Sequence, residues 1–385
     1  ESEHAPSGYQ SPQDLICTGG LVWVAPTTSG RDSGIYTGRD PKSGEVKSQF
    51  APDIDTYWFH HRCYIAKATD RFLIPSRTGI ELVDFKAEHW DINHWVRGGC
   101  LYGVMPCNGL LYAPPHDCAC YPEAKLYGLN ALAPPLKSAK VPKEISETDR
   151  LEKGPAFDSI KERDATVEEW PAYRHDNARS GSSGQKLRED LSMAWEIKLP
   201  GRLSALTIAE RLVFVAQIDQ HTVHALDVAN GKSRWTFTAG GRVDSPPTYW
   251  KGRLLFGSVD GWVYCLRASD GVLAWRYRAA PVDRRLGSFE QIESVWPVHG
   301  SVLVEKDIAT FVCGRSSFLD QGMRYMRLDP RTGTKLSETV MDDRDPLTGE
   351  DIQVRLKTLQ MPVGLNDLLS SDSEFIYLRS QKFDA

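Results

Sequence analysis

Histidine, arginine and tyrosine side chains are crowded into one part of the chain, between residues 60 and 116. Imidazole and phenol groups act as general bases and acids, and guanidinium groups bind carboxylate or sulfate groups. The candidate catalytic residues are His60, His61, His94 and Arg97. The candidate ligand-binding residues are Arg62, Tyr64, Arg77, Tyr102 and Tyr112. Such a set of side chains could bind an anionic sugar, and it could catalyse β-elimination on a uronate. Alternatively, the histidines pack between sheets and bond to backbone carbonyl groups.

The chain contains eight cysteines, and four of them lie between residues 100 and 120. Three interpretations are open. Disulfide bonds fit an oxidising compartment, with Cys100, Cys107, Cys118 and Cys120 as the candidates. Buried thiols suit Cys265 and Cys313, whose flanking residues alternate as in strands. Zinc or copper ligation is the third interpretation, with His116, Cys118 and Cys120 as candidates beside His60, His61 or Cys63, although their spacing matches no standard zinc motif.

Two stretches of sequence, forty residues apart, carry the same turn and the same aromatic residue. Gly231 aligns with Gly271, and Trp235 aligns with Trp275. The first turn begins at Asp227, whose carboxylate can bond to its own downstream backbone. Strand-like sequence repeating about every 40 residues is typical of a β-propeller blade. We therefore predict an all-β fold, a β-propeller of four-stranded antiparallel blades.

The two tryptophans follow their turn glycines by four residues, which places them on the outermost strand of each blade. There an indole can bury its face against the neighbouring blade while its N–H donates to a carbonyl group. In a propeller, the inner strand ends bring polar groups from different blades to one mouth. The predicted architecture therefore offers a place where the crowded His, Arg and Tyr side chains converge.

The repeat is interrupted in the middle of the chain. Residues 135–168 are rich in Pro, Lys, Glu and Asp and lack apolar periodicity, which is typical of a polar connector. We expect residues 1–134 to form propeller blades that carry the Cys- and His-rich segment. We expect residues 169–385 to form propeller blades with tryptophan-docking repeats. The last blade is expected to be incomplete and the chain to be part of a longer protein. Whether the blades form one ring or two stays open.

The amino-acid composition argues against two classes of function. The formal net charge is −5 and the sequence pI is about 6.1, whereas a nucleic-acid binder usually presents a basic field. No stretch approaches the roughly 18 apolar residues of a transmembrane helix. We therefore expect neither a nucleic-acid partner nor a transmembrane segment.

The sequence also resembles a known family. The segment from Trp170 through Tyr173 and Asp176 to Gly181, followed by Trp195, resembles the segment that leads into quinoprotein-type propellers. The repeat ending at Trp235 is similar to that superfamily's tryptophan-docking repeat. The chain is thus similar to bacterial PQQ-binding-like β-propeller repeat proteins of the quinoprotein alcohol dehydrogenase-like superfamily. This resemblance implies seven or eight blades in a complete ring, and a periplasmic, cell-envelope or secreted location.

The resemblance leaves several functions open. Dehydrogenases of this fold hold PQQ and calcium over a tryptophan, beside a ring made by two adjacent cysteines. This chain has no adjacent cysteine pair, and the calcium ligands match no positions, so no cofactor is assigned. We expect an exported binding or scaffolding module that holds a protein or glycan at the propeller mouth. The alternatives are two kinds of enzyme: a lyase or hydrolase acting on anionic glycans, or a PQQ-dependent dehydrogenase.

Overall fold

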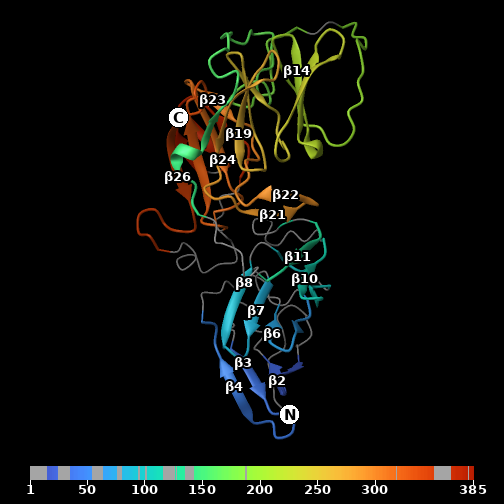
Figure 1. Cartoon of the computed structure of the whole chain (residues 1–385), viewed down its shortest axis with the longest axis vertical. Coiled ribbons are helices and arrows are strands. Elements are labelled where there is room, and N and C mark those ends of the chain that lie inside the picture. The colour runs from blue at the N-terminus through green and yellow to red at the C-terminus, as the bar shows by residue number, and fades with distance from the viewer. Residues whose placement is uncertain are drawn as a thin grey trace. The chain divides into compact units, whose positions relative to one another are not determined.

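The regular secondary structure of the described residues consists almost entirely of antiparallel strands, as predicted (Figure 1). The computed structural model describes residues 15–24, 35–53, 64–75, 80–93, 96–99, 102–115, 126, 128–134, 143–186, 189–317, 319–350, 366–379 and 381–385. Within these ranges the only helical elements are two short 3-10 turns, η2 (Glu147–Asp149) and η3 (Ile218–Gln220). None of the described helices is long and apolar enough to cross a membrane.

The chain divides into two compact units. Unit 1 contains residues 1–140, 287–291 and 345–362, and unit 2 contains residues 141–286, 292–344 and 363–385. A two-stranded hairpin, β21 (Arg285–Ser288) and β22 (Gln291–Ser294), lies where the chain passes between the units. The main division at residues 140 and 141 falls inside the segment expected to be a connector.

The described residues of unit 1 form two four-stranded sheets and one three-stranded sheet. The first has β1 (Ile16–Thr18), β2 (Leu21–Val24), β3 (Tyr36–Arg39) and β4 (Val46–Phe50). The second has β5 (Lys67–Ala68), β6 (Phe72–Ile74), β7 (Ile80–Asp84) and β8 (His89–Asn93). The third has β9 (Met105–Cys107), β10 (Leu110–Ala113) and β11 (Asn130–Leu132). Trp23, Tyr36 and Trp90 belong to one buried cluster between the first two sheets.

The described residues of unit 2 form four sheets whose strands follow one another in chain order, as in propeller blades. The first has β13 (Thr207–Ala209), β14 (Leu212–Gln217), β15 (Thr222–Asp227) and β16 (Ser233–Thr238). The second has β17 (Thr248–Trp250), β18 (Arg253–Gly257), β19 (Trp262–Arg267) and β20 (Leu273–Arg278). The third has β23 (Leu303–Glu305), β24 (Ile308–Cys313), β25 (Met323–Leu328) and β26 (Lys335–Met341). The last has β27 (Ser370–Ser371), β28 (Phe375–Leu378) and β29 (Gln381–Asp384).

The middle strands of these blades are buried on both faces. All residues of β14 and β18 are buried, because each strand has a sheet or loop against both of its sides. Phe214 and Phe256, one from each of these strands, belong to the same core cluster. A strand covered on both faces is apolar at successive positions rather than at alternate ones. The core of unit 2 therefore lies between successive blades.

The tryptophan-docking contact predicted from the repeat is present. Gly271 has a φ of +74°, and a Cβ atom placed on it would lie 2.5 Å from Cε3 of Trp235. The indole Nε1–H of Trp235 donates to the carbonyl oxygen of Ala268 at 3.0 Å. The same contact recurs twice, with Trp195 against Gly231 and with Trp275 against Gly333. Glycine is required at these turns because the backbone is left-handed and the indole ring fills the space of a side chain.

One irregular segment touches the innermost region of all four blades in unit 2. It is the segment from Trp170 to Arg179, whose resemblance to quinoprotein propellers was noted above. Its backbone and side-chain contacts are Trp170 with Ile208, Pro171 with Tyr249, Asn177 with Val304 and Ser371, and Arg179 with Leu369. These contacts fix the spacing of the blades around a common centre.

Residues 144–163, expected as part of a polar connector, lie along the outer side of one blade. Within them β12 (Leu151–Lys153) pairs with β20 in antiparallel register and adds a fifth strand to its sheet. The amide of Gly154 then donates to Ala274 O at 2.7 Å. The sequence shows no strand pattern here because only three residues pair and because charged side chains make most of the other contacts.

Candidate functional site

Most of the residues predicted to do chemistry lie outside the described residues. These are His60, His61, Arg62, Cys63, Arg77, His94, Cys100, His116, Cys118 and Cys120. Of the others, Arg97 and Tyr64 are buried in unit 1, and Gly98 and Gly103 lie against the Tyr64 ring. Tyr112 is half-buried on β10, whereas Tyr102 is 82 % exposed. The described part of the chain thus brings no predicted catalytic pair together.

Four cysteines are described, and all four are free thiols. Cys265 and Cys313 are fully buried on strands, which confirms the prediction of buried thiols. Burial raises the pKa of the Cys313 thiol to about 12, and it raises that of Cys265 as well. Cys17 and Cys107 are exposed. No group of three or more His, Cys, Asp or Glu side chains that could hold a metal ion occurs among the described residues.

A concentration of buried charge lies in unit 2, where loops that follow several strands meet β22. We call it the loop charge cluster, and it consists of Arg242, Asp244, Glu293, His299 and Arg315. Arg242 and Arg315 form ion pairs with Glu293, whose side chain has no exposed surface. Arg242 Nε donates to Asp244 Oδ1 at 3.2 Å, and Asp244 Oδ2 lies 2.7 Å from His299 Nδ1. Two guanidinium groups therefore face two carboxylates in a nearly dry interior.

The electrostatics of the loop charge cluster are internally balanced. Burial alone would raise the pKa of Asp244, but the hydrogen bond with His299 and the charge of Arg242 outweigh it and lower the pKa to about 2. Burial lowers the pKa of Arg315 despite its partner Glu293. Because each buried charge has an opposite charge in contact, the cluster fixes the loops rather than leaving a free charge for a ligand. Its Asp244–His299 pair, about a quarter exposed, is the part that solvent or a partner can reach.

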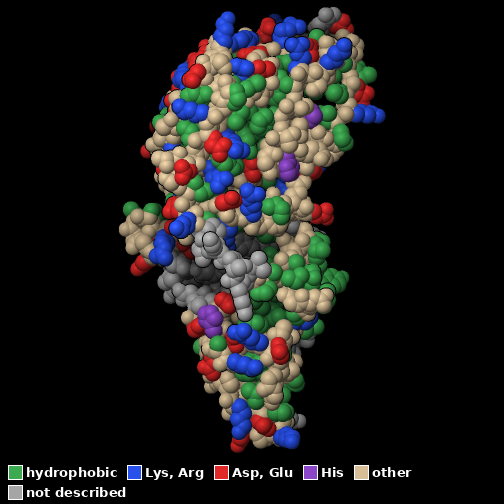
Figure 2. Space-filling view, viewed as in Figure 1, with side chains coloured by type: hydrophobic (Ala, Val, Ile, Leu, Met, Phe, Trp, Pro, Cys, Tyr) green, Lys and Arg blue, Asp and Glu red, His purple; other side chains and the backbone are tan. Residues whose placement is uncertain are grey.

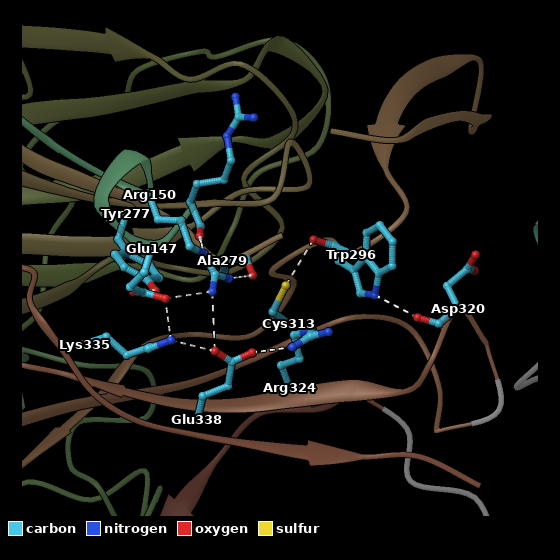
Figure 3. Close-up of polar contacts among 11 residues, drawn as sticks. Glu147, Arg150, Tyr277, Ala279, Trp296, Cys313, Asp320, Arg324, Lys335 and Glu338 are labelled. Carbon is cyan, nitrogen blue, oxygen red and sulfur yellow. Dashed lines mark hydrogen bonds and ion pairs between the residues drawn. The ribbon is translucent and has the colours of Figure 1, made fainter. Parts of the chain in front are cut away.

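A second network, the Arg150 cluster, consists of Glu147, Arg150, Arg324, Lys335 and Glu338. Figure 3 shows the Arg150 guanidinium between Glu147 and Glu338. The side chain is 5 % exposed, and its nitrogens also donate to the carbonyl oxygens of Arg278 at 2.9 Å and Ala279 at 2.6 Å. The cluster joins the segment that carries β12 to the outer strands β20 and β26.

Glu338 is the acidic centre of the Arg150 cluster. It pairs with Arg150 at 3.4 Å, with Lys335 at 2.9 Å and with Arg324. Burial would raise the pKa of its carboxyl group, but the hydrogen bonds from Lys335 and Arg324 prevail and lower it. The cations hold this carboxylate ionised, and the role of the network is structural.

Asp320 lies next to Trp296 (Figure 3), and the pKa of its carboxyl group is raised, whereas those of Asp244 and Glu338 are lowered. Its backbone carbonyl accepts the indole N–H of Trp296 at 3.1 Å, and its carboxylate pairs with Arg284 at 2.8 Å. Burial raises the pKa of this carboxyl group to about 6, because burial outweighs the charges of Arg284 and Arg315. The ionised carboxylate is therefore a cost to the folded state at neutral pH.

We expect Asp320→Asn to raise the free energy of unfolding by about 2–3 kcal/mol above pH 6 and to change it little below pH 4. Between these values the folded protein holds a proton that the unfolded chain has released, so stability falls as the pH rises. Denaturant unfolding at pH 4 and pH 7 measures the difference. Asp283→Asn is the control, because Asp283 is half exposed. Equal effects of Asp320→Asn at both pH values would contradict the assignment.

A groove of about 910 Å³ opens in unit 2 at the turns between β13 and β14, β17 and β18, and β19 and β20. It is lined by Ser159, Ile160, Lys161, Glu162, Arg163, Glu210, Arg211, Gly252, Arg267, Ser269 and Asp270. Most of its charges are already paired, Arg163 with Glu169 and Arg267 with Asp270. On the face seen in Figure 2, basic and acidic side chains are likewise interspersed. The charged side chains that line the groove are of both signs, so the groove shows no single-sign field.

Sequence reasoning missed the buried charges of both networks. Arg150 lies in the segment expected to be a connector, Arg242 lies in a loop between blades, and Glu293 lies on β22. The pattern of apolar residues contains no signal for an ion pair that forms between distant loops. The turn glycines and tryptophans were found because they recur at a fixed spacing.

A family comparison agrees with the fold and with the resemblance found in the sequence. Part of the chain is similar to PQQ-like β-propeller repeats. The matching family model is described as outer membrane protein assembly factor BamB and covers residues 181–367, just under half of the chain. No curated protein matches the chain by sequence.

Several solved structures are similar to parts of the chain. A quinohemoprotein alcohol dehydrogenase from Comamonas testosteroni is 19% identical, covering 47% of this chain and 28% of that chain, with a TM-score of 0.37. A quinohemoprotein alcohol dehydrogenase from Pseudomonas putida is 15% identical, covering 62% and 36%, with a TM-score of 0.42. BamB from Moraxella catarrhalis is 13% identical, covering 94% and 80%, with a TM-score of 0.28. The chain spans about a third of the length of the two dehydrogenases, and likenesses of this size carry no argument about activity.

Proposed function

We propose that the chain is a protein-binding scaffold of the bacterial cell envelope. The observation that carries this proposal is the match of residues 181–367 to a family described as an outer membrane protein assembly factor. The structure of unit 2 supports the same function. The blades of unit 2 are fixed by docked tryptophans and by internally paired charges, which is the rigidity that a docking platform needs.

The residues present do not fit a PQQ cofactor with calcium. The sequence has no adjacent cysteine pair, and the described residues contain no group of three potential ligands. We therefore derive no reaction step through that group. The candidate residues for an anionic glycan lie mostly outside the described residues, and the structure lends that alternative no support.

Chemical cross-linking of the full chain in its native envelope tests the proposal. We expect a discrete protein partner, identified by mass spectrometry of cross-linked peptides and reproduced with purified components. The same preparation should not reduce a dye with alcohols after addition of PQQ and calcium, nor cleave anionic glycans. Turnover in either assay without a protein partner would overturn the proposal.

A further inference from the structure

One part of the lining of the groove in unit 2, residues 159–163, is held in place by direct contacts. Arg267 Nη1 donates to Ser159 Oγ at 2.7 Å. A Cβ atom placed on Gly252 would lie 2.6 Å from the carbonyl oxygen of Lys161, so this segment lies directly against the turn between β17 and β18. The groove therefore has a fixed shape, and its volume of about 910 Å³ is in the range of roughly 300–1,000 Å³ that is usual for ligand sites.

The three acidic side chains of the groove lining all bond to neighbouring groups of the protein. The bonded sets are Glu162 with Arg253 and Arg331, Asp270 with Arg267, and Glu210 with the hydroxyl group of Tyr249. The distances in these sets lie between 2.6 and 3.1 Å. Carboxylate oxygens that already accept such bonds have less capacity left for a ligand. The acidic side chains of the groove therefore serve the fold, and a basic ligand finds little to bind.

The four basic side chains of the groove lining fall into two groups. Arg163 and Arg267 form the ion pairs given above. Lys161 and Arg211 are exposed, and neither forms an ion pair with another described residue. Ammonium and guanidinium groups offer hydrogen-bond donors and no acceptors. With four basic and three acidic side chains the lining has a net charge of +1, and Lys161 and Arg211 are the groups with which it can hold an anion.

The backbone of the turn between β13 and β14 supports a role for the side chain of Arg211. Its φ is +61°, in the left-handed region that is strained for any residue with a side chain. The equivalent positions in the next two blades are Gly252, between β17 and β18, and Asp307, between β23 and β24. Asp307 has a φ of +59° and forms ion pairs with Lys251 and Arg331. The strained position is thus used there for its side chain, and at Arg211 it places a guanidinium group in the groove lining.

We infer that this groove binds an acidic peptide segment of a partner protein, whose carboxylate side chains pair with Lys161 and Arg211. This inference rests on the proposed function, since it names the kind of segment that the scaffold takes. Charge complementarity favours an acidic occupant, and a guanidinium group binds a carboxylate through two parallel hydrogen bonds. Because each exposed ion pair contributes little by itself, an extended chain with several contacts fits the groove better than a single small anion.

Binding of two synthetic peptides to the full chain, measured by fluorescence anisotropy, tests this inference. The acidic peptide is Gly-Glu-Asp-Ser-Glu-Asp-Gly, and the amide peptide is Gly-Gln-Asn-Ser-Gln-Asn-Gly. We expect the acidic peptide to bind at least about tenfold more tightly, and the difference to shrink at high ionic strength because exposed charges are screened. Inorganic phosphate at matched ionic strength should bind at least about tenfold more weakly than the acidic peptide. A photo-reactive group on the acidic peptide should label residues of the groove lining.

Two double variants separate the groove from the general charge of the protein. Lys161→Gln with Arg211→Gln removes both groove cations and should weaken binding of the acidic peptide at least about tenfold. Lys232→Gln with Lys306→Gln is the matched control, because it removes the same charge from exposed turns of unit 2 outside the groove lining. We expect the control to change the affinity less than about twofold. All four side chains are exposed, so both variants should fold normally, which thermal unfolding checks.

Four outcomes would overturn the inference. They are equal affinity for the two peptides, equal losses in the two double variants, photo-labelling away from the groove lining, and phosphate binding as tight as that of the acidic peptide. The last would mean that the groove holds a small anion. If cross-linking still finds a protein partner elsewhere on the chain, the groove site falls and the proposed function stands.

Discussion

Replacing Arg150 by Met will lower the free energy of unfolding of unit 2 by about 3–5 kcal/mol. The substitution keeps an unbranched apolar stem but leaves the mostly buried Glu338 and the carbonyl groups of Arg278 and Ala279 without this buried donor. Removing one partner of a buried ionic network costs more than the network's net contribution, because the remaining groups stay desolvated. Denaturant unfolding of the full chain measures the loss. Hydrogen exchange should show the amides of β12 losing protection first.

Arg202→Ala is the matched control for Arg150→Met. Arg202 forms a geometrically good pair with Asp219 at 2.6 Å, but its side chain is largely exposed. Exposed pairs are screened by solvent, so we expect a loss of no more than about 1 kcal/mol. Equal losses of stability in the two variants would show that the Arg150 cluster does not hold the β12 segment against β20 and β26.

Gly271→Ala will lower the free energy of unfolding by about 2–5 kcal/mol. The left-handed backbone at this turn costs any other residue about 1–2 kcal/mol. The added methyl group would also displace the Trp235 ring from its docked position, and overpacking of this kind costs about 1–3 kcal/mol more. Thermal and denaturant unfolding, together with tryptophan fluorescence of the folded state, measure both effects.

Gly201→Ala separates backbone strain from the clash at Gly271. Gly201 has a similar φ of +81°, and its nearest neighbour would lie 3.7 Å from an added Cβ, an ordinary contact. We therefore expect a loss of only about 1–2 kcal/mol. Similar losses for Gly201→Ala and Gly271→Ala would show that the indole does not fill the turn.

The sequence predicts the blades well because their strongest signals are local and repeated. Gly231 and Trp235 reappear as Gly271 and Trp275, and the structure shows why: each pair forms one docking contact between neighbouring blades. The docking of Trp195, which precedes Trp235 by 40 residues, follows the same geometry and the same spacing, whereas the contact of Trp275 with Gly333 keeps the geometry over a longer stretch of chain. A repeat of this kind survives in sequence because backbone conformation and ring packing both require it.

The candidate site was far less predictable. The residues singled out for acid, base and metal chemistry were grouped by their proximity in sequence, and most lie outside the described residues. Buried charges such as Arg242 and Glu293 become partners only when the loop after β16 meets β22 in the folded chain. The strand position of residues 151–153 depends on β20, which follows it by more than 100 residues. Long-range pairing of this kind leaves no periodic pattern in the local sequence.

A double-mutant cycle at Trp235 and Gly271 tests most directly whether the blades are joined by an indole seated on the next turn. The cycle compares Gly271→Ala in the natural chain and in a Trp235→Leu background, by denaturant unfolding. With the smaller leucine the methyl group finds space, so its cost should fall toward that of backbone strain, giving a coupling of about 1–3 kcal/mol. Additive losses, with a coupling below about 0.5 kcal/mol, would contradict the docking of the blades through this contact.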